Sequence, residues 1–161
     1  GEAGGAGLRR ARQAGATMVD NAVRVSETGN GKLAESIAVR QHRFAADEPV
    51  AHGGTDTGPS PYDLLLAALG SCTAMTLRLY ADRKGWPVER ISVRLNHDKV
   101  HAEDSAEAGA QHAMLDRIER VIILEGPLDA AQRQRLLEIA DHCPVHRTLQ
   151  SKILIRSQIA A

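Results

Sequence analysis

Two cysteines are the residues whose chemistry most needs explaining, and their surroundings differ. Cys72 lies inside the apolar stretch GPSPYDLLLAALGSCT, and Cys143 opens the stretch CPVHRTL. A free cysteine in an apolar helix is most often an inert core residue, and burial raises the pKa of its thiol. Cys72 is therefore a reagent only if another element of the protein activates it.

Cys143 lies at a predicted break between two helices, because Pro144 directly follows it. A position at the N-terminus of a helix favours the thiolate form of a cysteine. His146 and Arg147 follow within one turn, so a proton acceptor and a cation lie near that sulfur. Each of these residues alone is more often a capping or surface residue, but together they are typical of a reactive thiol.

The elements that hold the two cysteines follow from periodicity and turn residues. Ser60, Pro61 and Asp63 form a capping-box pattern, which predicts the start of a long helix that ends before Gly85. Apolar residues cover nearly every side of this helix, so we expect it to be enclosed at the centre of the molecule. Strands are predicted at 19–27, 33–40, 41–46, 91–100, 118–124 and 152–159, and a second helix at 126–143.

The length and charge of the chain exclude several classes of protein. A chain of 161 residues is long enough for one domain with its own core. Its 20 basic and 20 acidic side chains balance, so the sequence predicts no binding to nucleic acid or to an anionic membrane surface. Residues 1–17 are rich in glycine, alanine and arginine and are expected to form a flexible tail, followed by one domain at 18–161.

Cysteine usage and apolar run length bear on the compartment. Two widely separated cysteines form neither a C-x-x-C pair nor the dense framework of a small secreted domain, which favours a reducing compartment. The longest apolar run is too short to span a bilayer, and no signal peptide is recognised at the N-terminus. We therefore expect a cytoplasmic protein without a membrane segment.

Two motifs in order carry a resemblance to a known family. The stretches GPSPYDLLLAALGSCTAMTL and HCPVHRTL, preceded by ADEP and a Gly-Gly loop, resemble the OsmC/Ohr family of organic hydroperoxide reductases and osmotically inducible proteins, in particular its YhfA-like branch. The resemblance spans roughly residues 18–159. It implies an α+β, OsmC-like fold with antiparallel sheets around a long buried central helix, in an intertwined homodimer with active sites at the subunit interface.

The resemblance also implies a mechanism. Cys72 matches the peroxidatic cysteine of the family and Cys143 the resolving one. A Cys72 thiolate would attack an organic hydroperoxide and become a sulfenic acid, which would condense with Cys143 into a disulfide. An external dithiol, a lipoylated protein in the better-known members, would reduce that disulfide. No cofactor and no metal is implied.

The sequence departs from the better-known members at the groups that activate the nucleophile. Their glutamate after the helix-starting proline is Tyr62 here, with Asp63 next to it. Their arginine from the N-terminal hairpin has Lys32 as the nearest basic counterpart, a point charge without the guanidinium fork. His42, upstream of ADEP, is the histidine most expected to face the site. His146 and Arg147 complete the supporting residues.

Two other interpretations of the cysteines stay open. In the first, the protein is a non-catalytic binding protein with core cysteines, and a small apolar molecule occupies a pocket beside Gly70 and Ser71. In the second, Cys72, Cys143 and the histidines at 142 and 146 form a tetrahedral metal site. The break at Pro144 and the missing fourth local ligand do not match a standard zinc motif.

Overall fold

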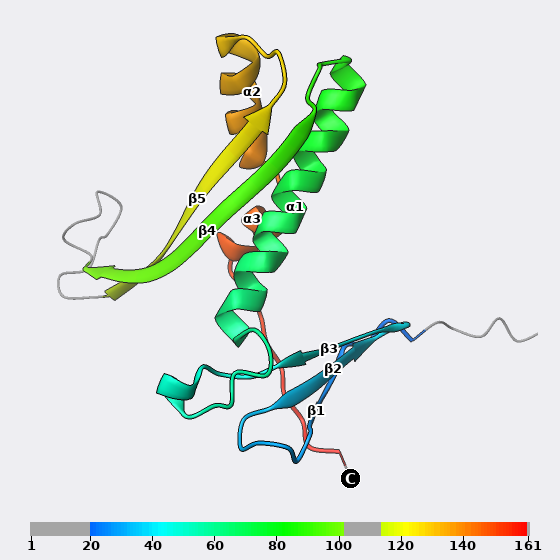
Figure 1. The fold of residues 1–161 in the computed structure, drawn as a ribbon, viewed down its shortest axis with the longest axis vertical. Helices are drawn as coiled ribbons and strands as arrows, with labels where there is room; N and C mark the ends of the chain where they lie inside the picture. The colour runs from blue at the N-terminus through cyan, green and yellow to red at the C-terminus, as the bar shows by residue number, and fades with distance from the viewer. Residues whose placement is uncertain (1–19, 102–113, 161) are drawn as a thin grey trace, which may run out of the picture.

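The computed structural model describes residues 20–101 and 114–160, so the expected tail at 1–17 lies outside the described part. The strands are β1 (Arg24–Glu27), β2 (Glu35–Val39), β3 (His42–Ala46), β4 (Arg90–His101) and β5 (Met114–Glu125). The helices are α1 (Pro61–Lys84), α2 (Ala130–Ala140), α3 (Pro144–Leu149) and a short 3-10 turn, η1 (Val50–His52). The strands form two antiparallel sheets, β1-β2-β3 and β4-β5. The predicted α+β class with small antiparallel sheets and a long central helix is confirmed (Figure 1).

The start of α1 follows from its local sequence. The Ser60 hydroxyl accepts a hydrogen bond from the Asp63 backbone N–H at 3.2 Å, and the Asp63 carboxylate accepts one from the Ser60 N–H at 2.9 Å. These bonds satisfy N–H groups that a helix start otherwise leaves unpaired. Gly85 ends the helix at a φ of 67°, where a residue without a side chain is favoured. Both predicted ends of α1 are confirmed.

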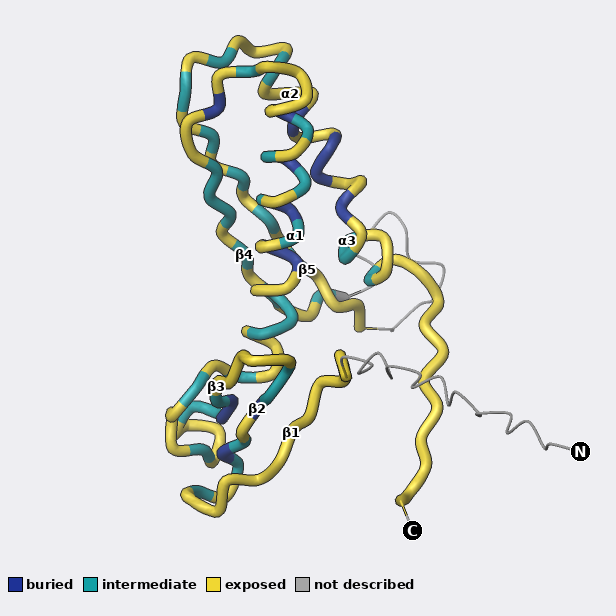
Figure 2. Tube along the Cα trace, turned by 90° about the vertical axis from the view of Figure 1, so that its right-hand side faces the viewer, coloured by how far each residue is buried: buried dark blue, intermediate teal, exposed yellow. Residues whose placement is uncertain are grey.

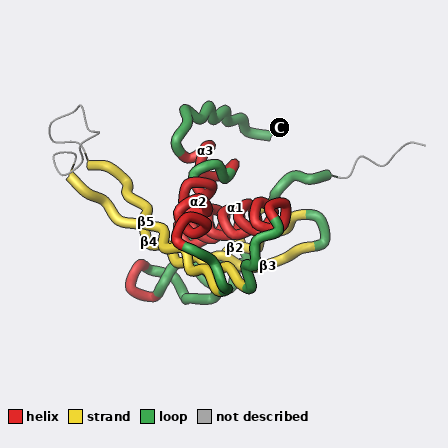
Figure 3. The backbone as a smooth tube through the Cα atoms, turned by 90° about the horizontal axis from the view of Figure 1, so that it is seen from above, coloured by secondary structure: helices red, strands yellow, loops and turns green. Residues whose placement is uncertain are grey.

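The core lies between the second half of α1, the start of β4 and α2. Figure 3 shows α1 and α2 side by side on one face of the β4–β5 sheet. The buried core residues are Leu77, Ala81, Val88, Leu136, Ile139 and Ala140. Gly70 allows the close approach of α1 to β4, because a Cβ atom at this position would lie 2.7 Å from Leu95 Cδ1. The helix and sheet layers are therefore in close contact near the middle of α1.

The other side of α1 is uncovered in the single chain. Met75 is 66% exposed and Leu79 is 65% exposed. Figure 1 shows the β1–β3 sheet beyond the N-terminal end of α1, where it leaves this side of the helix open, and Figure 2 shows that little of that sheet is buried. The expected enclosure of α1 on nearly every side is therefore not reached by the described residues of one chain.

By length and composition alone, α1 is apolar enough to cross a membrane, which the analysis of short apolar runs did not predict. The core helix of a soluble protein passes the same test. Here α1 shares its core with a two-stranded sheet, whose outer edges pair with no further strand among the described residues, and lipid cannot satisfy the backbone groups of an open edge. This packing is that of a core helix.

The strand predicted at 152–159 does not form in the described chain. The segment is extended but pairs with no strand among the described residues. Its apolar side chains are exposed: Ile153 by 54%, Leu154 by 76%, Ile155 by 81% and Ile159 by 99%. A strand needs a neighbouring edge to pair its N–H and C=O groups, and among the described residues neither the β1–β3 sheet nor the β4–β5 sheet pairs with this segment.

Asp47 organises the loop that leads into α1. Its carboxylate is 2% exposed and accepts hydrogen bonds from the hydroxyls of Thr55 at 2.6 Å and Thr57 at 2.7 Å. The backbone N–H groups of Glu48, Thr55 and Thr57 also donate to it. The pKa of Asp47 is strongly lowered, chiefly by the Thr55 and Thr57 hydroxyls. The loop is thus an ordered element held by one ionised carboxylate.

Replacing Asp47 with Asn is expected to lower the thermal midpoint at pH 7, because an amide cannot accept at both oxygen positions. The depressed pKa adds stability above the ordinary carboxyl pKa of 3.8, and this contribution is lost as the pH falls below that value. The variant should therefore lose less stability than the parent between pH 5 and pH 3. Calorimetry across that range measures both effects, with Asp56→Asn in the same loop as the control. Equal pH dependence of parent and variant would contradict the assignment.

Candidate functional site

The structure brings the two cysteines together from distant parts of the chain. Cys72 lies near the middle of α1 and is half-buried, and Cys143 is fully buried directly before α3. The two side chains lie close enough for each thiol to shift the pKa of the other. Cys143 directly precedes α3, and α3 packs against α1. Cys143 therefore lies on the side of α1 that carries Cys72. The site is therefore a pair of adjacent free thiols.

The two thiols differ in their preference for the charged form. Burial raises the pKa of Cys72, and the contact with Cys143 raises it further. Burial also acts to raise the pKa of Cys143, but the hydrogen bond from Cys72 and the backbone N–H groups of His146 and Val145 outweigh it and lower that pKa. The two pKa shifts are opposite in direction, and the Cys143 sulfur faces the backbone N–H groups at the start of α3.

Arg120 on β5 is a site residue that the sequence analysis missed. Its guanidinium donates to Thr73 Oγ1 and to Asp141 Oδ1, each at 3.0 Å. Its side chain is only 12% exposed. A signal was present in the sequence, because Arg120 occupies the inward-facing register of β5 between Ile118 and Ile122. A charged residue in that apolar row needs partners inside the protein.

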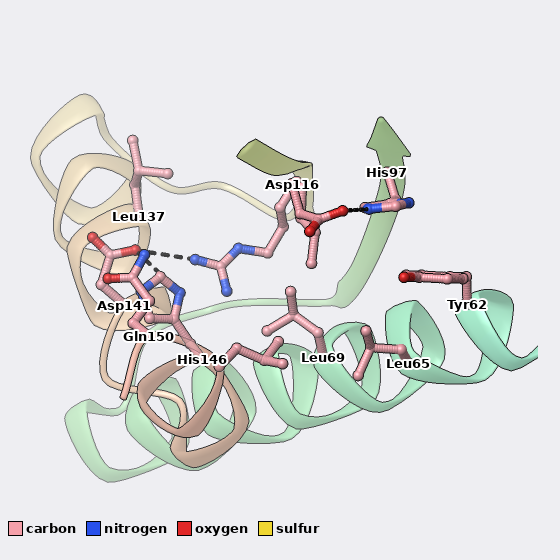
Figure 4. A pocket seen from close by; sticks show the side chains of 12 residues that line it. Tyr62, Leu65, Leu69, His97, Asp116, Leu137, Asp141, His146 and Gln150 are labelled. Atoms are coloured by element: carbon pink, nitrogen blue, oxygen red, sulfur yellow. Dashed lines mark hydrogen bonds and ion pairs between the residues drawn. The ribbon is translucent and has the colours of Figure 1, made fainter. Parts of the chain in front are cut away.

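A cavity of about 620 Å³ lies between α1, the β4–β5 sheet and the α2–α3 segment (Figure 4). Its apolar wall consists of Leu65, Leu69, Ile118, Leu137 and Leu149. Its polar groups are Tyr62, His97, Asp116, Arg120, Asp141, His146 and Gln150. Neither cysteine lines the cavity, but Leu69 lies one turn before Cys72 on the same side of α1. The cavity therefore ends close to the thiol pair without including it.

One end of the cavity holds an aromatic and ionic cluster. The Tyr62 ring stacks on His97 with ring centroids 4.5 Å apart, and His97 Nε2 lies 2.8 Å from Asp116 Oδ1 (Figure 4). Lys99 Nζ also donates to Asp116 at 3.0 Å. Hydrogen bonds from Lys99 and His97 lower the pKa of Asp116. Tyr62, at the position where the better-known family members have glutamate, thus orients an imidazole.

Three of the predicted supporting residues lie away from the thiols in the single chain. Asp63 is engaged in capping α1, and Cys72 lies about 14 Å further along the helix at 1.5 Å per residue. Lys32, in the β1–β2 turn, and His42, at the start of β3, are exposed on the N-terminal sheet. The fold places the start of α1, which carries Asp63, and the N-terminal sheet, which carries Lys32 and His42, away from Cys72.

The two supporting residues on α3 lie closer to the site. His146 lines the cavity, and its Nδ1 lies 3.9 Å from Asp141 Oδ1. Arg147 is exposed, and its guanidinium lies 3.3 Å from His142 Nδ1. His146 is therefore placed to contact a molecule in the cavity, whereas Arg147 packs on the outer side of α3.

The alternative interpretations find limited support. Within residues 20–101 and 114–160, no three His, Cys, Asp or Glu side chains are grouped so that they could hold a metal ion. Gly70 is buried against Leu95 and Ser71 is exposed, and neither residue lines the cavity described above. That cavity lies beside Leu65 and Leu69.

The family follows from a comparison of the whole sequence. A model of the family described as OsmC-like protein matches residues 54–158. The chain belongs to the OsmC-like family. The match includes both cysteines and Arg120, and it confirms the resemblance carried by the two motifs. No curated protein matches this OsmC-like chain.

Solved structures share the OsmC-like fold at low sequence identity. An OsmC-like protein from Mycoplasma pneumoniae is 17% identical, with a TM-score of 0.60, over 81% of this chain and 89% of that chain. An organic hydroperoxide resistance protein OsmC from Legionella pneumophila is 14% identical, with a TM-score of 0.59, over 80% and 88%. An organic hydroperoxide resistance protein from Elizabethkingia anophelis is 17% identical, with a TM-score of 0.59, over 80% and 86%. At these identities the likeness shows the fold.

Proposed function

We propose that this OsmC-like protein is a thiol-dependent peroxidase that reduces organic hydroperoxides to alcohols. The observation that carries the proposal is the proximity of Cys72 and Cys143, which the fold brings together from α1 and the start of α3 so that each thiol shifts the pKa of the other. Two structures of the same fold belong to organic hydroperoxide resistance proteins, which supports a redox role in peroxide resistance.

The exposure of the two thiols supports different roles. Cys72 is the more accessible sulfur and acts as the nucleophile, and the fully buried Cys143 acts as the resolving thiol. The Cys72 thiolate bonds to the distal peroxide oxygen, the O–O bond breaks, and the alkoxide leaves and takes up a proton. The Cys72 sulfenic acid then condenses with the Cys143 thiol, releasing water. A dithiol, such as a lipoylated protein, returns the disulfide to two thiols.

The substrate class follows from the cavity near the thiol pair. Its wall carries five aliphatic side chains, and its two ends carry polar groups. An apolar pocket gains affinity from burying hydrocarbon, which hydrogen peroxide does not have. The cavity therefore favours a hydroperoxide with an organic body, and it lets His146 or His97 contact a polar group.

We also propose that the protein acts as a soluble cytoplasmic homodimer. Met75 and Leu79 on α1 and the apolar side chains after Ser151 are exposed in the single chain, which is unusual for a stable monomer. A second copy that covers them would also pack against the N-terminal sheet, which carries Lys32 and His42. These residues then support a site from the other subunit rather than from their own.

Rapid mixing of the reduced protein with cumene hydroperoxide tests the enzymatic proposal. We expect loss of two thiols per chain, one cumyl alcohol per disulfide, and a rate at least about tenfold above that with hydrogen peroxide, as an apolar pocket provides. Intact mass measures the disulfide and chromatography measures the alcohol. Thiols that persist in excess peroxide would rule out the peroxidase and favour a binding protein.

That second candidate rests on one observation, which is that neither cysteine lines the cavity. A protein that only binds small amphipathic molecules needs the cavity and not the thiols. Its thermal midpoint would rise with ligand in the same way in the parent and in a variant without cysteines.

A further inference from the structure

Arg120 contacts both segments that carry the cysteines. One of its guanidinium nitrogens donates to Thr73, the residue after Cys72, and another donates to Asp141, two residues before Cys143. We propose that Arg120 is a positioning residue that holds the Cys72 and Cys143 segments at disulfide-forming distance. The inference rests on the proposed function for its purpose, but the geometry and its test do not depend on peroxide.

The α1 end of this bridge is rigid. Thr73 is fully buried, and its hydroxyl donates to the Leu69 carbonyl oxygen at 2.7 Å. Its only hydroxyl proton is thereby used, so the oxygen is oriented to accept from Arg120 at 3.0 Å. A guanidinium held by Thr73 is consequently fixed relative to the helical turn that carries Cys72.

The other end of the bridge controls the turn before α3. The backbone N–H groups of Asp141, His142 and Cys143 donate to the carbonyls of Glu138, Ile139 and Ala140, which makes this turn continuous with the end of α2. Asp141 is the C-terminal capping residue of α2, and its carboxylate accepts from Arg120 at 3.0 Å. Anchoring Asp141 therefore anchors Cys143 as well.

The chemistry of the bridge requires arginine. A guanidinium presents several N–H donors in a planar fork and serves two acceptors at once, whereas a lysine ammonium acts as a point charge. The side chain is 12% exposed among the inward residues of β5, where a charge is stable only with fixed partners. Without the Arg120 guanidinium, the segments that carry Cys72 and Cys143 are no longer held together. The effective concentration of one thiol at the other then falls.

The test is the equilibrium between the protein dithiol and oxidised glutathione, which yields the protein disulfide and two reduced glutathione molecules. We expect Arg120→Gln to lower this equilibrium constant by about tenfold or more, since small misplacements of reacting groups cost this much. Arg120→Lys should not restore it, because the charge alone does not bridge. Asp141→Ala, which removes the acceptor oxygen, should have a similar effect, and it carries little folding risk because that side chain is 65% exposed.

The matched control is Arg117→Gln, which removes another arginine of β5 and its 2.6 Å ion pair with Asp98. It should leave the equilibrium constant unchanged. The proposal would be overturned if Arg120→Lys keeps the parental equilibrium constant, and equally if Asp141→Ala keeps it. If the parent forms this disulfide with glutathione but does not react with cumene hydroperoxide, the peroxidase proposal fails while the role of Arg120 stands.

In the peroxide reaction, the same variants distinguish the loss of the positioning of Cys72 and Cys143 from a general loss of structure. Under excess cumene hydroperoxide, the sulfinic form of Cys72 should accumulate in Asp141→Ala at the expense of the disulfide, whatever the rate of the first oxidation. Intact mass shows the partition. Slower first oxidation with an unchanged partition would contradict a role in closing the disulfide.

Discussion

Replacing Cys72 with Ser is expected to abolish the consumption of organic hydroperoxide. A serine hydroxyl is not ionised near neutral pH, so it cannot replace the thiolate as the nucleophile. Cys143 remains in this variant, but it is fully buried and cannot be reached by the peroxide without local opening. Loss of cumene hydroperoxide from solution, followed by a colorimetric peroxide assay, measures the effect, and we expect the rate to fall to the background level.

Replacing Cys143 with Ser should give a different result. The first oxidation of Cys72 should persist for one turnover, because the nucleophile is intact. Without a resolving thiol, the sulfenic acid persists and under excess peroxide gains a second and then a third oxygen. Intact mass spectrometry follows these additions, and steady turnover with a dithiol reductant should fall at least about a hundredfold.

The control for both cysteine variants is Ser71→Ala. Ser71 is exposed next to Cys72, and its hydroxyl donates to the Ala68 carbonyl within the same helix. This variant should react like the parent. If both cysteine variants also consume peroxide like the parent, neither sulfur is a reagent, and the pair is part of the packing between α1 and α3.

A double replacement of Met75 and Leu79 with Glu should convert a dimer into a monomer. These side chains lie one helical turn apart on the uncovered side of α1 and are 66% and 65% exposed. If a second copy buries these side chains, each chain of the variant must bury two unpaired carboxylates when the dimer forms, which costs several kcal/mol. The dissociation constant should rise by at least about a thousandfold, since each 1.4 kcal/mol is a factor of ten.

Light scattering across micromolar concentrations measures the assembly. The parent should have twice the mass of the chain, with an interface above about 2,000 Å² in total, as obligate dimers have. Val50→Glu, a change of the same kind at a residue that is 71% exposed in η1, is the control and should stay dimeric. A parent that scatters as a monomer at these concentrations would sink the dimer proposal.

Local sequence was sufficient for the elements whose signals are local. The capping box at Ser60 and Asp63 and the stop at Gly85 defined α1, because the groups that cap a helix lie within a few residues of its ends. The antiparallel strands before and after α1 followed from alternation and turns in the same way. The two motifs around Cys72 and Cys143 were sufficient to recognise the OsmC-like family.

Contacts between distant segments were decided by the tertiary structure. From the sequence, Arg120 is recognised only as a residue of a strand. The tertiary structure shows that it lies between Thr73 and Asp141 and donates to both. The sequence offered Asp63 both as a helix cap and as a supporting carboxylate, and the fold confirms the cap but places Cys72 about 14 Å further along α1. The segment at 152–159 has the composition of a strand, but a strand exists only where another edge pairs with it. Periodicity reports which side of an element is apolar, and only the fold decides what covers that side, because the covering residues are remote in the chain.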